Sequence, residues 1–480
     1  MRQAEARLTD ALHAHAGRTL FDCADGGRVS YADVLELGEQ PAFKTARRRL
    51  VFCISENDPG GLTGYLALLS ANAVPLMLGA GTSPLQLQPL IDAYQPGLIW
   101  LPCSRVGEFP SAKPLLIHGD YCLLETGEQA YPVHDSLALL MSTSGSTGSP
   151  KFVRLSHANL LGNAQAIAQY LELTADEVPI TTLPPSYTYG LSIIHSHLLV
   201  GSRIALTNQS FFDRGFWGLL KAAGATSLGG VPYHYEILKR LRFTRMELPS
   251  LRTLTQAGGR MAPELTQEYA AHCAAHGMRF FTMYGQAEAT ARIAYLPPEK
   301  ALAKAGSIGI AIPGGRLWIE DEHGQVQQGT EAVGELVYQG GNVSMGYARG
   351  YADLAREDER GGILRTGDMA RRDAEGDYHI IGRLKRFLKL FGHRVNLQDI
   401  EQWLLEAGHA VACAGRDDRL EIYQPLATPE AAKEIKAKVV KHIKVAPGAV
   451  RVIGIGALPR NDAGKIRYAD LAAQAGEILA

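Results

Sequence analysis

Three patterns that would point to a function at once are missing from this sequence. Its 480 residues include only six cysteines, scattered without a CxxC pair, which excludes a disulfide framework and a cysteine zinc site. Lys+Arg number 48 against 49 Asp+Glu, and this balance excludes a chain that binds nucleic acid through its overall charge. The longest apolar stretch, residues 189–200, contains two histidines and is too short to cross a bilayer. We therefore expect reduced thiols, no nucleic-acid partner and no membrane insertion.

The first residues give no sign of an export signal. Residues 1–17 carry charges of both signs and lack the apolar run of a signal peptide, so we expect an amphipathic surface helix there. Together with the scattered cysteines, this favours a reducing, cytoplasmic location.

What the sequence does contain is a regular alternation of two kinds of segment. Short apolar runs rich in β-branched residues, such as residues 50–55, 137–141 and 279–283, alternate with longer helical stretches. This alternation predicts an α/β fold in which parallel sheets are covered by helices on both faces. One core rarely spans so many elements, so we expect two stacked α/β subdomains.

The pattern changes twice towards the carboxyl end. Between residues 289 and 381, short strands separated by Gly-rich turns predict a β-rich lobe that completes the large domain. Residues 383–480 carry 16 Lys+Arg and 11 Asp+Glu, a net charge of +5, and alternate short strands with helices such as 429–445. We predict an N-terminal domain of residues 1–382 and a small basic α+β domain of residues 383–480.

The stretch with the clearest chemistry is residues 141–151, MSTSGSTGSPK. It follows a predicted buried strand and precedes a predicted helix at 156–170, which is where α/β sheets bind ligands. Glycines let backbone N–H groups approach a polyphosphate, hydroxyls donate hydrogen bonds, and Lys151 neutralises charge. Pro150 stands where a Walker A loop requires glycine, so the loop is not of that type. Taken alone, most such Ser/Gly runs are solvated turns.

The stretch STSGSTGSPK resembles the signature of the acyl-adenylate-forming (AMP-binding) ligase superfamily, which includes acyl-CoA synthetases, adenylation domains of peptide synthetases and luciferases. Five further stretches match that family in the expected order, and the resemblance covers essentially the whole chain past Leu137. They are GGRMAP (258–263), MYGQAEAT (283–290), GELVYQGGNVSMGY (334–347), LRTGDMA (364–370) with GRLKRFLKLFGHRV (382–395), and PRNDAGKIR (459–467).

The resemblance implies a reaction in two steps. ATP and a carboxylic acid give an acyl-adenylate and pyrophosphate, and a thiol then attacks the activated carbonyl. Two anions meet at the α-phosphate in the first step, so positive charge and Mg²⁺ are required there. The matching positions imply catalytic roles for Lys465, Lys151 and Glu288, with Glu288 as the Mg²⁺ ligand.

The resemblance also implies a set of nucleotide-binding positions. Gly258 and Gly259 match residues whose backbone approaches adenine, and Tyr284 matches an aromatic residue that stacks on it. Asp368 and Arg383 match residues that bind the ribose hydroxyls. The full expected set is Ser142, Thr143, Ser144, Gly145, Ser146, Thr147, Gly148, Gly258, Gly259, Tyr284, Gly285, Asp368 and Arg383.

A mobile C-terminal domain is a further implication of the resemblance. In the family this domain rotates after adenylation about a hinge, which falls here at Lys385. The rotation removes the loop that carries Lys465 and brings Gly392 towards the thiol channel, where glycine lets a phosphopantetheine arm pass close to the backbone. The acceptor is either CoA or the phosphopantetheinyl group of a carrier protein, and the basic tail suits both.

The nature of the acid is indicated by residues 185–198 and 229–235. Amino-acid-activating relatives carry an aspartate for the substrate ammonium where this chain has Thr188, so an α-amino acid is disfavoured. We expect His195 and His197 to be satisfied helix histidines rather than substrate ligands. The residues expected to form a pocket for a fatty or aryl acid are Tyr187, Tyr189, Leu191 and Tyr235.

One departure from the family pattern bears on activity. Ala287 stands where most members have a threonine beside the α-phosphate, so one hydroxyl donor is missing. The leading hypothesis is an ATP-dependent acid–thiol ligase with CoA as the expected acceptor. One alternative is an acyl-AMP ligase that loads a carrier protein. Another, favoured only by Ala287, is a catalytically weakened nucleotide-binding regulatory protein.

Overall fold

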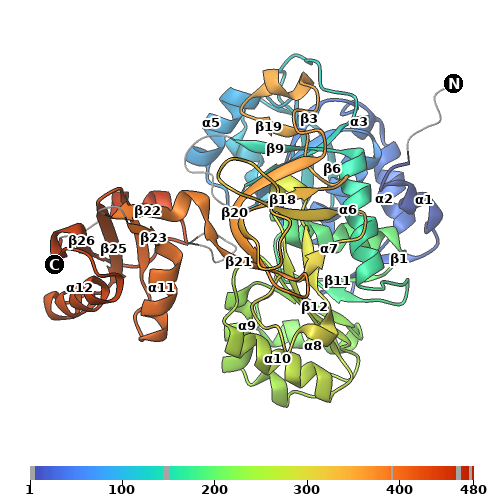
Figure 1. Cartoon of the computed structure of the whole chain (residues 1–480). Helices are drawn as coiled ribbons and strands as arrows, with labels where there is room; N and C mark the ends of the chain where they lie inside the picture. Colours follow the sequence, from blue (N-terminus) through green and yellow to red (C-terminus); the bar gives the residue numbers. More distant parts are fainter. Residues whose placement is uncertain (1–5, 144–150, 391–392, 461–465, 475–477, 480) are drawn as a thin grey trace. The chain divides into compact units, whose positions relative to one another are not determined.

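The chain divides into two compact units in the computed structural model (Figure 1), which describes residues 6–143, 151–390, 393–460, 466–474 and 478–479. The first unit consists of Met1–Leu317 with Tyr338–Leu364, and the second of Trp318–Val337 with Arg365–Ala480. The predicted boundary between residues 382 and 383 falls inside the second unit, and the division into two domains at that point stays a prediction.

The first unit contains a nine-stranded sheet whose middle is parallel. Strands β14 to β1 in the sheet order run parallel, and antiparallel strands flank them on both sides. The order is β16 (Ile310–Ala311), β15 (Ala294–Leu296), β14 (Arg279–Tyr284), β13 (Thr253–Gln256), β12 (Ser227–Gly230), β10 (Pro179–Ile180), β11 (Ile204–Leu206), β1 (Thr19–Cys23) and β2 (Arg28–Ser30).

An eight-stranded sheet forms the other half of the same unit. Its central strands β8, β4, β3 and β5 are parallel, and its outer strands on both sides are antiparallel. The order is β19 (Gly346–Ala348), β9 (Phe152–Ser156), β8 (Leu137–Ser142), β4 (Val74–Gly79), β3 (Leu50–Ser55), β5 (Leu98–Pro102), β7 (Tyr121–Glu125) and β6 (Lys113–His118).

Helices of the first unit pack on both sheets. They are α1 (Asp10–Ala14), α2 (Tyr31–Glu39), α3 (Pro41–Lys44), α4 (Pro59–Ser70), α5 (Pro84–Tyr94), α6 (His157–Tyr170), α7 (Thr188–Leu199), α8 (Arg214–Ala222), α9 (Pro232–Arg240) and α10 (Pro263–Ala275). The buried residues Phe216, Tyr235 and Tyr269 join α8, α9 and α10 to the nine-stranded sheet. In Figure 1 these three helices lie together, in green to yellow.

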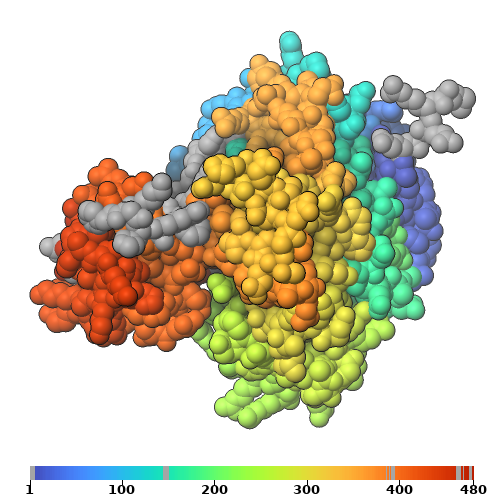
Figure 2. All heavy atoms as spheres, viewed as in Figure 1, coloured from blue at the N-terminus to red at the C-terminus, as the bar shows by residue number. Residues whose placement is uncertain are grey.

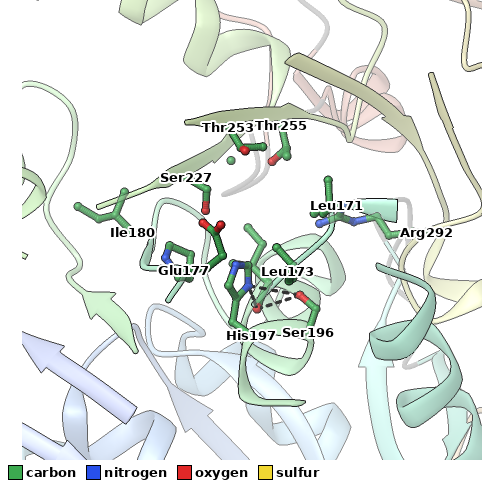
Figure 3. Close-up of a pocket in the computed structure, with 13 residues that line it drawn as sticks. Leu171, Leu173, Glu177, Ile180, Ser196, His197, Ser227, Thr253, Thr255 and Arg292 are labelled. Atoms are coloured by element: carbon green, nitrogen blue, oxygen red, sulfur yellow. Dashed lines mark hydrogen bonds between the residues drawn. The ribbon is translucent and has the colours of Figure 1, made fainter. Parts of the chain in front are cut away.

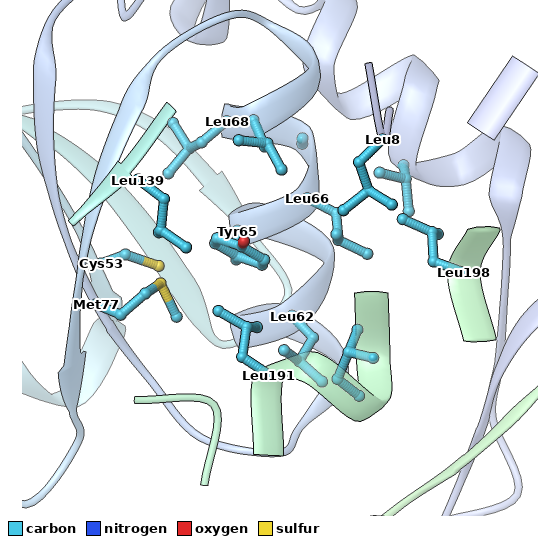
Figure 4. Packing of buried hydrophobic residues seen from close by; sticks show 14 of the residues in the cluster. Leu8, Cys53, Leu62, Tyr65, Leu66, Leu68, Met77, Leu139, Leu191 and Leu198 are labelled. Carbon is cyan, nitrogen blue, oxygen red and sulfur yellow. The ribbon is translucent and has the colours of Figure 1, made fainter. Parts of the chain in front are cut away.

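A shared hydrophobic core holds the two large sheets together. Leu62 and Tyr65 of α4 pack with Leu191 and Leu198 of α7 and with Leu139 of β8 (Figure 4). The same cluster contains residues of β1 and β11 from one sheet and of β3 and β4 from the other. Each fully buried leucine contributes roughly 1.5–3 kcal/mol, so this layer fixes α7 rigidly against both sheets.

The second unit has smaller sheets. One sheet consists of β17 (Arg316–Glu320), β18 (Val333–Gln339), β20 (Ile363–Arg372) and β21 (Tyr378–Arg383). The first two residues of β17, the last two of β18 and the first two of β20 are assigned to the first unit. A hairpin of β22 (Phe387–Leu390) and β23 (His393–Asn396) precedes α11 (Leu397–Glu406).

A three-stranded sheet carries the carboxyl-terminal helix. Strand β24 (Ala412–Arg416) pairs antiparallel with β25 (Arg419–Pro425), and β25 pairs parallel with β26 (Val450–Ile455). Helix α12 (Pro429–Ile443) forms the crossover between the parallel strands, capped by the Thr428 hydroxyl. Its apolar residues Ile435 and Val439 are buried against Ile422 and Val452. In the space-filling view of Figure 2, the residues of this sheet and helix belong to the orange to red part of the chain.

The predicted α/β class with several stacked sheets is confirmed. Two details differ from the sequence-based expectations: both large sheets have antiparallel edges, and α1 is a short helix of five residues. Within the described residues, no helix is long and apolar enough to cross a membrane.

Candidate functional site

The serine-rich stretch connects two antiparallel strands. Ser142 is the last residue of β8 and pairs with Phe152, the first residue of β9, so Thr143 and Lys151 stand at the two ends of the loop. The expected residues Ser144, Gly145, Ser146, Thr147 and Gly148 lie outside the described residues.

The helix predicted at residues 156–170 follows the loop as α6, with strand β9 between them. The five residues of β9 are buried and pair with β8, and α6 begins only after them, capped by Ser156. Strand β9 therefore separates the amino terminus of α6 from Lys151, which places a positive charge at the end of the loop.

A tyrosine links Lys151 to Glu288. Strand β19 pairs antiparallel with β9, which places Tyr347 opposite Val153 and beside Lys151. Lys151 Nζ lies 3.4 Å from the centroid of the Tyr347 ring, within cation–π range. The Tyr347 hydroxyl donates a 2.7 Å hydrogen bond to Glu288 Oε1. Residues from three distant parts of the chain thus meet beside the serine-rich loop.

The electrostatics of this cluster keep the tyrosine protonated. Burial, and then the negative charge of Glu288, raise the pKa of Tyr347 to about 12. The Arg360 guanidinium carbon lies 4.9 Å from the same ring centroid and opposes this shift. Tyr347 is therefore a hydrogen-bond donor at neutral pH, and Glu288 has one of its carboxylate oxygens held in place.

A strained turn positions Glu288. The residue lies in the 3₁₀ turn η3 (Ala287–Ala289), which ends at Thr290 with the left-handed φ of 65°. Asn342 holds the turn, since its Nδ2 donates to Ala289 O at 2.9 Å and its backbone carbonyl accepts from Thr290 Oγ1 at 2.8 Å. Such strain persists only where neighbouring contacts fix it, and it is frequent at functional sites.

The donor set around Glu288 suits Mg²⁺ bound together with a substrate. The described residues contain no group of three His, Cys, Asp or Glu that would hold a metal alone. Mg²⁺ is commonly held by one or two carboxylates together with substrate phosphates and water. A single oriented carboxylate next to a phosphate-type loop fits that arrangement.

Glycines follow two neighbouring strands, and because they lack side chains their backbone is not covered by a Cβ. Gly258, after β13, has φ +85°, and a Cβ there would collide with the Tyr187 hydroxyl. Gly285, after β14, touches the Ala291 carbonyl so closely that no side chain fits. Because β13 and β14 are parallel neighbours, the two glycines lie together at the carboxyl ends of these strands, which form one edge of the sheet. Gly259 lies at this edge too, as does Tyr284, whose hydroxyl accepts a 3.0 Å hydrogen bond from Gln286 Nε2.

The four residues expected to form the acid pocket divide into two groups. The Tyr189 and Tyr235 hydroxyls both donate to Thr255 O, at 2.9 and 2.8 Å. Tyr187 precedes α7 and its ring lies edge-on to that of Tyr189, with 6.3 Å between the centroids. Leu191 instead belongs to the core shared by the two sheets.

The two helix histidines of α7 have different surroundings. His195 Nε2 lies 2.8 Å from the Tyr65 hydroxyl, as expected of a satisfied histidine. His197 Nδ1 donates to Ile193 O at 2.8 Å, but its buried Nε2 has no partner among the described residues. Burial lowers the pKa of both, to about 3 for His195 and about 4 for His197, so both are neutral at pH 7.

A pocket lies between α7 and the parallel strands β12 and β13 (Figure 3). Its wall includes Thr253 and Thr255 of β13, His197 of α7, and the side chain of Arg292. Sequence reasoning did not single out Arg292, because an arginine after a strand turn is usually solvated. Here it is only 1 % exposed.

In the second unit, the two residues expected at the ribose form an ion pair. Asp368 of β20 stands opposite Arg383 of β21 in the antiparallel register, and Arg383 Nε lies 2.9 Å from Asp368 Oδ1. The aspartate side chain is 4 % exposed and the arginine 56 %. Lys385 falls in the turn η6 (Leu384–Arg386), whereas Gly392 and Lys465 lie outside the described residues.

Several residues of the site were missed by sequence reasoning. Tyr347 and Asn342 lie within the quoted stretch 334–347, but the sequence alone gives no sign of their partners. Arg360 follows that stretch and reaches Tyr347 only through the fold. Strand β19 has only three residues, so no local pattern indicates its pairing with β9.

Several known proteins resemble this chain in sequence. Residues 9–348 match the model of a protein family described as AMP-binding enzyme. The chain is 28% identical over 281 residues to feruloyl-CoA synthase of Amycolatopsis sp, covering 58% of this chain and 56% of that protein. It is 26% identical over 423 residues to malformin synthetase mlfA of Aspergillus homomorphus (strain CBS 101889), covering 82% of this chain but only 8% of that protein.

Solved structures share the fold. The o-succinylbenzoate CoA synthetase (MenE) of Bacillus subtilis, in complex with its acyl-adenylate intermediate, superposes with a TM-score of 0.79 at 21% identity and covers 99% of both chains. ATP-bound MatB of Rhodopseudomonas palustris has a TM-score of 0.75 at 21% identity, covering 96% of this chain and 97% of MatB.

Proposed function

Since the chain belongs to the AMP-binding enzyme family, we propose that it joins AMP to a carboxylic acid and then transfers the acyl group to a thiol, with CoA as the expected acceptor. The observation that carries this proposal is the meeting of Lys151, Tyr347 and Glu288 beside the serine-rich loop. Attack of one anion on another requires positive charge, which Lys151 supplies directly and which Glu288 would supply by holding Mg²⁺.

In the proposed first step, a carboxylate oxygen of the acid attacks the α-phosphorus of ATP. An O–P bond forms, the bond to the bridging oxygen breaks, and pyrophosphate leaves with that electron pair. Lys151 offsets the charge of the phosphates, and Glu288, oriented by Tyr347, would hold Mg²⁺. When bound, the metal neutralises charge on the phosphate oxygens.

The remaining roles are proposed from the resemblance. The loop hydroxyls bind phosphates, Gly258 and Gly259 leave room for adenine, and Tyr284 stacks on it. Asp368 and Arg383 bind the ribose hydroxyls, and the buried side chain of Asp368 suits a fixed hydrogen-bond acceptor. Residues 383–480 move as a domain about Lys385, carrying Lys465 to the nucleotide in the first step and Gly392 towards the thiol in the second.

The acid is proposed to be a fatty or aryl acid. Thr188, at the start of α7, has a hydroxyl where an ammonium group would need a carboxylate. Beside it lie the apolar Met141 and Leu191. The match to feruloyl-CoA synthase supports an acid of this kind. The match to malformin synthetase carries less weight, because this chain covers only 8% of that much longer protein.

ATP–pyrophosphate exchange over a panel of fatty, aryl and short hydroxy acids tests the first step. We expect exchange with at least one acid, and a loss of at least about 100-fold in Glu288→Gln and Lys465→Ala. Lys465→Ala should still form thioester from supplied acyl-adenylate. Absence of exchange with every acid, in protein shown to be folded by circular dichroism, would refute the proposal.

The alternative acceptor is a carrier protein, which the basic charge of residues 383–480 suits as well as it suits CoA. Residues 383–480 have a net charge of +5, and α12 presents Lys433 and Lys441 to solvent. A basic surface attracts an acidic carrier protein. Thioester formation measured with free CoA and with a phosphopantetheinylated carrier protein, side by side, separates the two acceptors.

A further inference from the structure

Arg292 is a buried cation that no carboxylate balances. Its side chain forms no ion pair with any acidic residue that the structure describes, and its buried Nε has no hydrogen-bond partner among them. Nη1 donates a 2.9 Å hydrogen bond to the Tyr170 hydroxyl and contacts Met283 Sδ, and the guanidinium carbon lies 4.5 Å from the Tyr189 ring centroid. Because a guanidinium stays protonated, this burial is costly unless an anion arrives.

The other large buried arginine of the unit shows the usual solution. Arg154 is 0 % exposed, and it donates to the carbonyls of Met345 and Glu357 at 2.9 and 3.1 Å. Its Nη2 also lies 3.2 Å from Glu359 Oε2. The Nε of Arg154 also lacks a partner, so the contrast lies in the terminal nitrogens: those of Arg154 meet carbonyls and a carboxylate, whereas Nη1 of Arg292 meets a phenol and a thioether.

The Arg292 side chain belongs to the pocket wall. In Figure 3 it extends into the pocket from the side opposite Ile180 and Glu177, while Thr253 and Thr255 form another side. Gly229 lies on the same wall, where a Cβ would approach Ile193 Cδ1 to 2.9 Å. Its lack of a side chain keeps the pocket open between α7 and β12.

The charges around the pocket leave Arg292 uncompensated. Glu177 already accepts from the Thr226 hydroxyl and lies 3.5 Å from Arg252 Nη2. Burial raises the pKa of Tyr170, so its phenol is neutral. His197 is neutral as well and offers only the lone pair of Nε2.

The pocket lies close to the strand ends at Gly258 and Gly285, where adenylation is expected. Thr255 of β13 faces the pocket, and the same strand leads to Gly258 three residues later. Three residues span at most about 10 Å. The turn that carries Glu288 also leads to Arg292, whose backbone carbonyl accepts from Asn342 Nδ2 at 2.8 Å. One rigid segment therefore carries both the Glu288 carboxylate and the Arg292 cation.

We propose that Arg292 binds a second anionic group of the acid substrate, so that the preferred substrates are dicarboxylic acids whose distal carboxylate enters this pocket. The inference rests on the proposed acid-activating function and narrows its substrate class. Arg292 acts here as a specificity-determining residue. The carboxylate that is adenylated stays at the edge formed by Gly258 and Glu288.

Paired substrates test the proposal. ATP–pyrophosphate exchange is measured with α,ω-dicarboxylic acids of four to eight carbons, with monocarboxylic acids of the same chain lengths, and with aryl acids with and without a second carboxylate. We expect kcat/KM to be about 100-fold higher for the best diacid than for its matched monoacid. Equal or better use of the monoacids overturns the role of Arg292 while leaving the acid-activating function intact.

Variants distinguish recognition from a structural role. Arg292→Met should reduce kcat/KM for the diacid by about 100-fold and leave that for the monoacid within about threefold, whereas Arg292→Lys should keep part of the preference. Arg154→Met is the matched control, since it removes a buried arginine without changing the ratio between the two acids. An equal loss for both acids in Arg292→Met, or no loss in either, contradicts the proposal.

A binding measurement covers the case in which no acid supports exchange. The diacid alone should raise the Tm of the wild-type chain and leave that of folded Arg292→Met unchanged. If it does so without any exchange, the pocket assignment stands and the proposed function falls. If neither exchange nor a Tm shift is seen with any diacid, both fall.

Discussion

The Tyr347 hydroxyl donates a 2.7 Å hydrogen bond to Glu288 Oε1. The two residues are far apart in the sequence, and the segment before β19 brings them together, since Ser344 N donates to Glu288 O and Asn342 Nδ2 to Ala289 O, both at 2.9 Å. The same ring faces Lys151 Nζ at 3.4 Å, so one tyrosine orients the proposed metal-binding carboxylate and the proposed phosphate-binding amine. Its hydroxyl and its ring have separable roles.

Replacing Tyr347 by Phe should therefore affect the metal rather than the fold. The ring and its contact with Lys151 remain, but Glu288 loses the donor that orients it. We expect the Mg²⁺ concentration for half-maximal exchange to rise about 10- to 100-fold, as for other residues that orient metal ligands. Tyr131→Phe is the control, because it removes the 2.6 Å hydrogen bond from the Tyr131 hydroxyl to Tyr94 O in another part of the unit. An unchanged Mg²⁺ titration would show that Tyr347 does not act on the metal site.

The pair of Asp368 and Arg383 should behave as a coupled unit. Arg383→Ala leaves the carboxylate of Asp368, 4 % exposed, without its 2.9 Å contact to the guanidinium. We expect each single variant to weaken ATP binding, and the double variant to be less impaired than the sum, with a coupling of about 1–3 kcal/mol. Isothermal titration of nucleotide with the four proteins of the cycle measures this coupling. Strict additivity would contradict a functional link between the two residues.

Features set by neighbouring residues could be predicted from the sequence, and features set by contacts between distant segments could not. The alternation of apolar runs gave β3, β8 and β14 nearly at their observed bounds, because strand and helix periods are local properties. The motif residues Gly258 and Gly285 lie together because their strands are parallel neighbours, which the predicted fold class implies.

The long-range register could not be predicted. Nothing local indicates that β19 pairs with β9, so the contact between Tyr347 and Lys151 was missed even though both residues stand in quoted motifs. The same limit applies to Arg292: its burial follows from the packing of α6 and α7, since Tyr170 and Tyr189 enclose its guanidinium. A lone arginine carries no sequence signal of that environment.

The buried histidines predict a loss of stability in acid. Burial lowers the pKa of His195 to about 3 and that of His197 to about 4, below the value of about 6.5 in an unfolded chain. Below pH 6.5 the unfolded state binds more protons, so stability is complete above this pH and falls as the pH decreases towards 4. The slope is about 1.4 kcal/mol per pH unit for each histidine. Tm measured from pH 8 to pH 4 should fall less steeply in His195→Gln, and an unaltered slope would contradict the assignment.

Gly285 should tolerate no side chain. A Cβ at this position would overlap the Ala291 carbonyl oxygen and approach Arg292 Cα to 2.9 Å, so the backbone of the turn after β14 would have to move. We expect Gly285→Ala to lower the free energy of unfolding by about 1–3 kcal/mol. The variant should also lose most of its ATP–pyrophosphate exchange activity, because the turn that carries Glu288 is displaced. Gly218→Ala in α8 is the matched control, because nothing lies within 4 Å of its Cβ and alanine favours a helix. Urea unfolding of both variants tests the contrast.

Restoring a hydroxyl at residue 287 decides between an active ligase and a weakened nucleotide-binding protein. Ala287 is 8 % exposed, at the edge of the shared core and directly before Glu288, so a threonine there places a new donor beside the carboxylate turn. If the chain is an active ligase, Ala287→Thr should raise kcat for adenylation about tenfold by adding one donor to the transition state. Ala287→Val is the control, since it adds nearly the same volume without a donor. Nucleotide binding without turnover, in wild type and in Ala287→Thr alike, would instead assign the chain a regulatory role, because a missing hydroxyl would then not be what limits it.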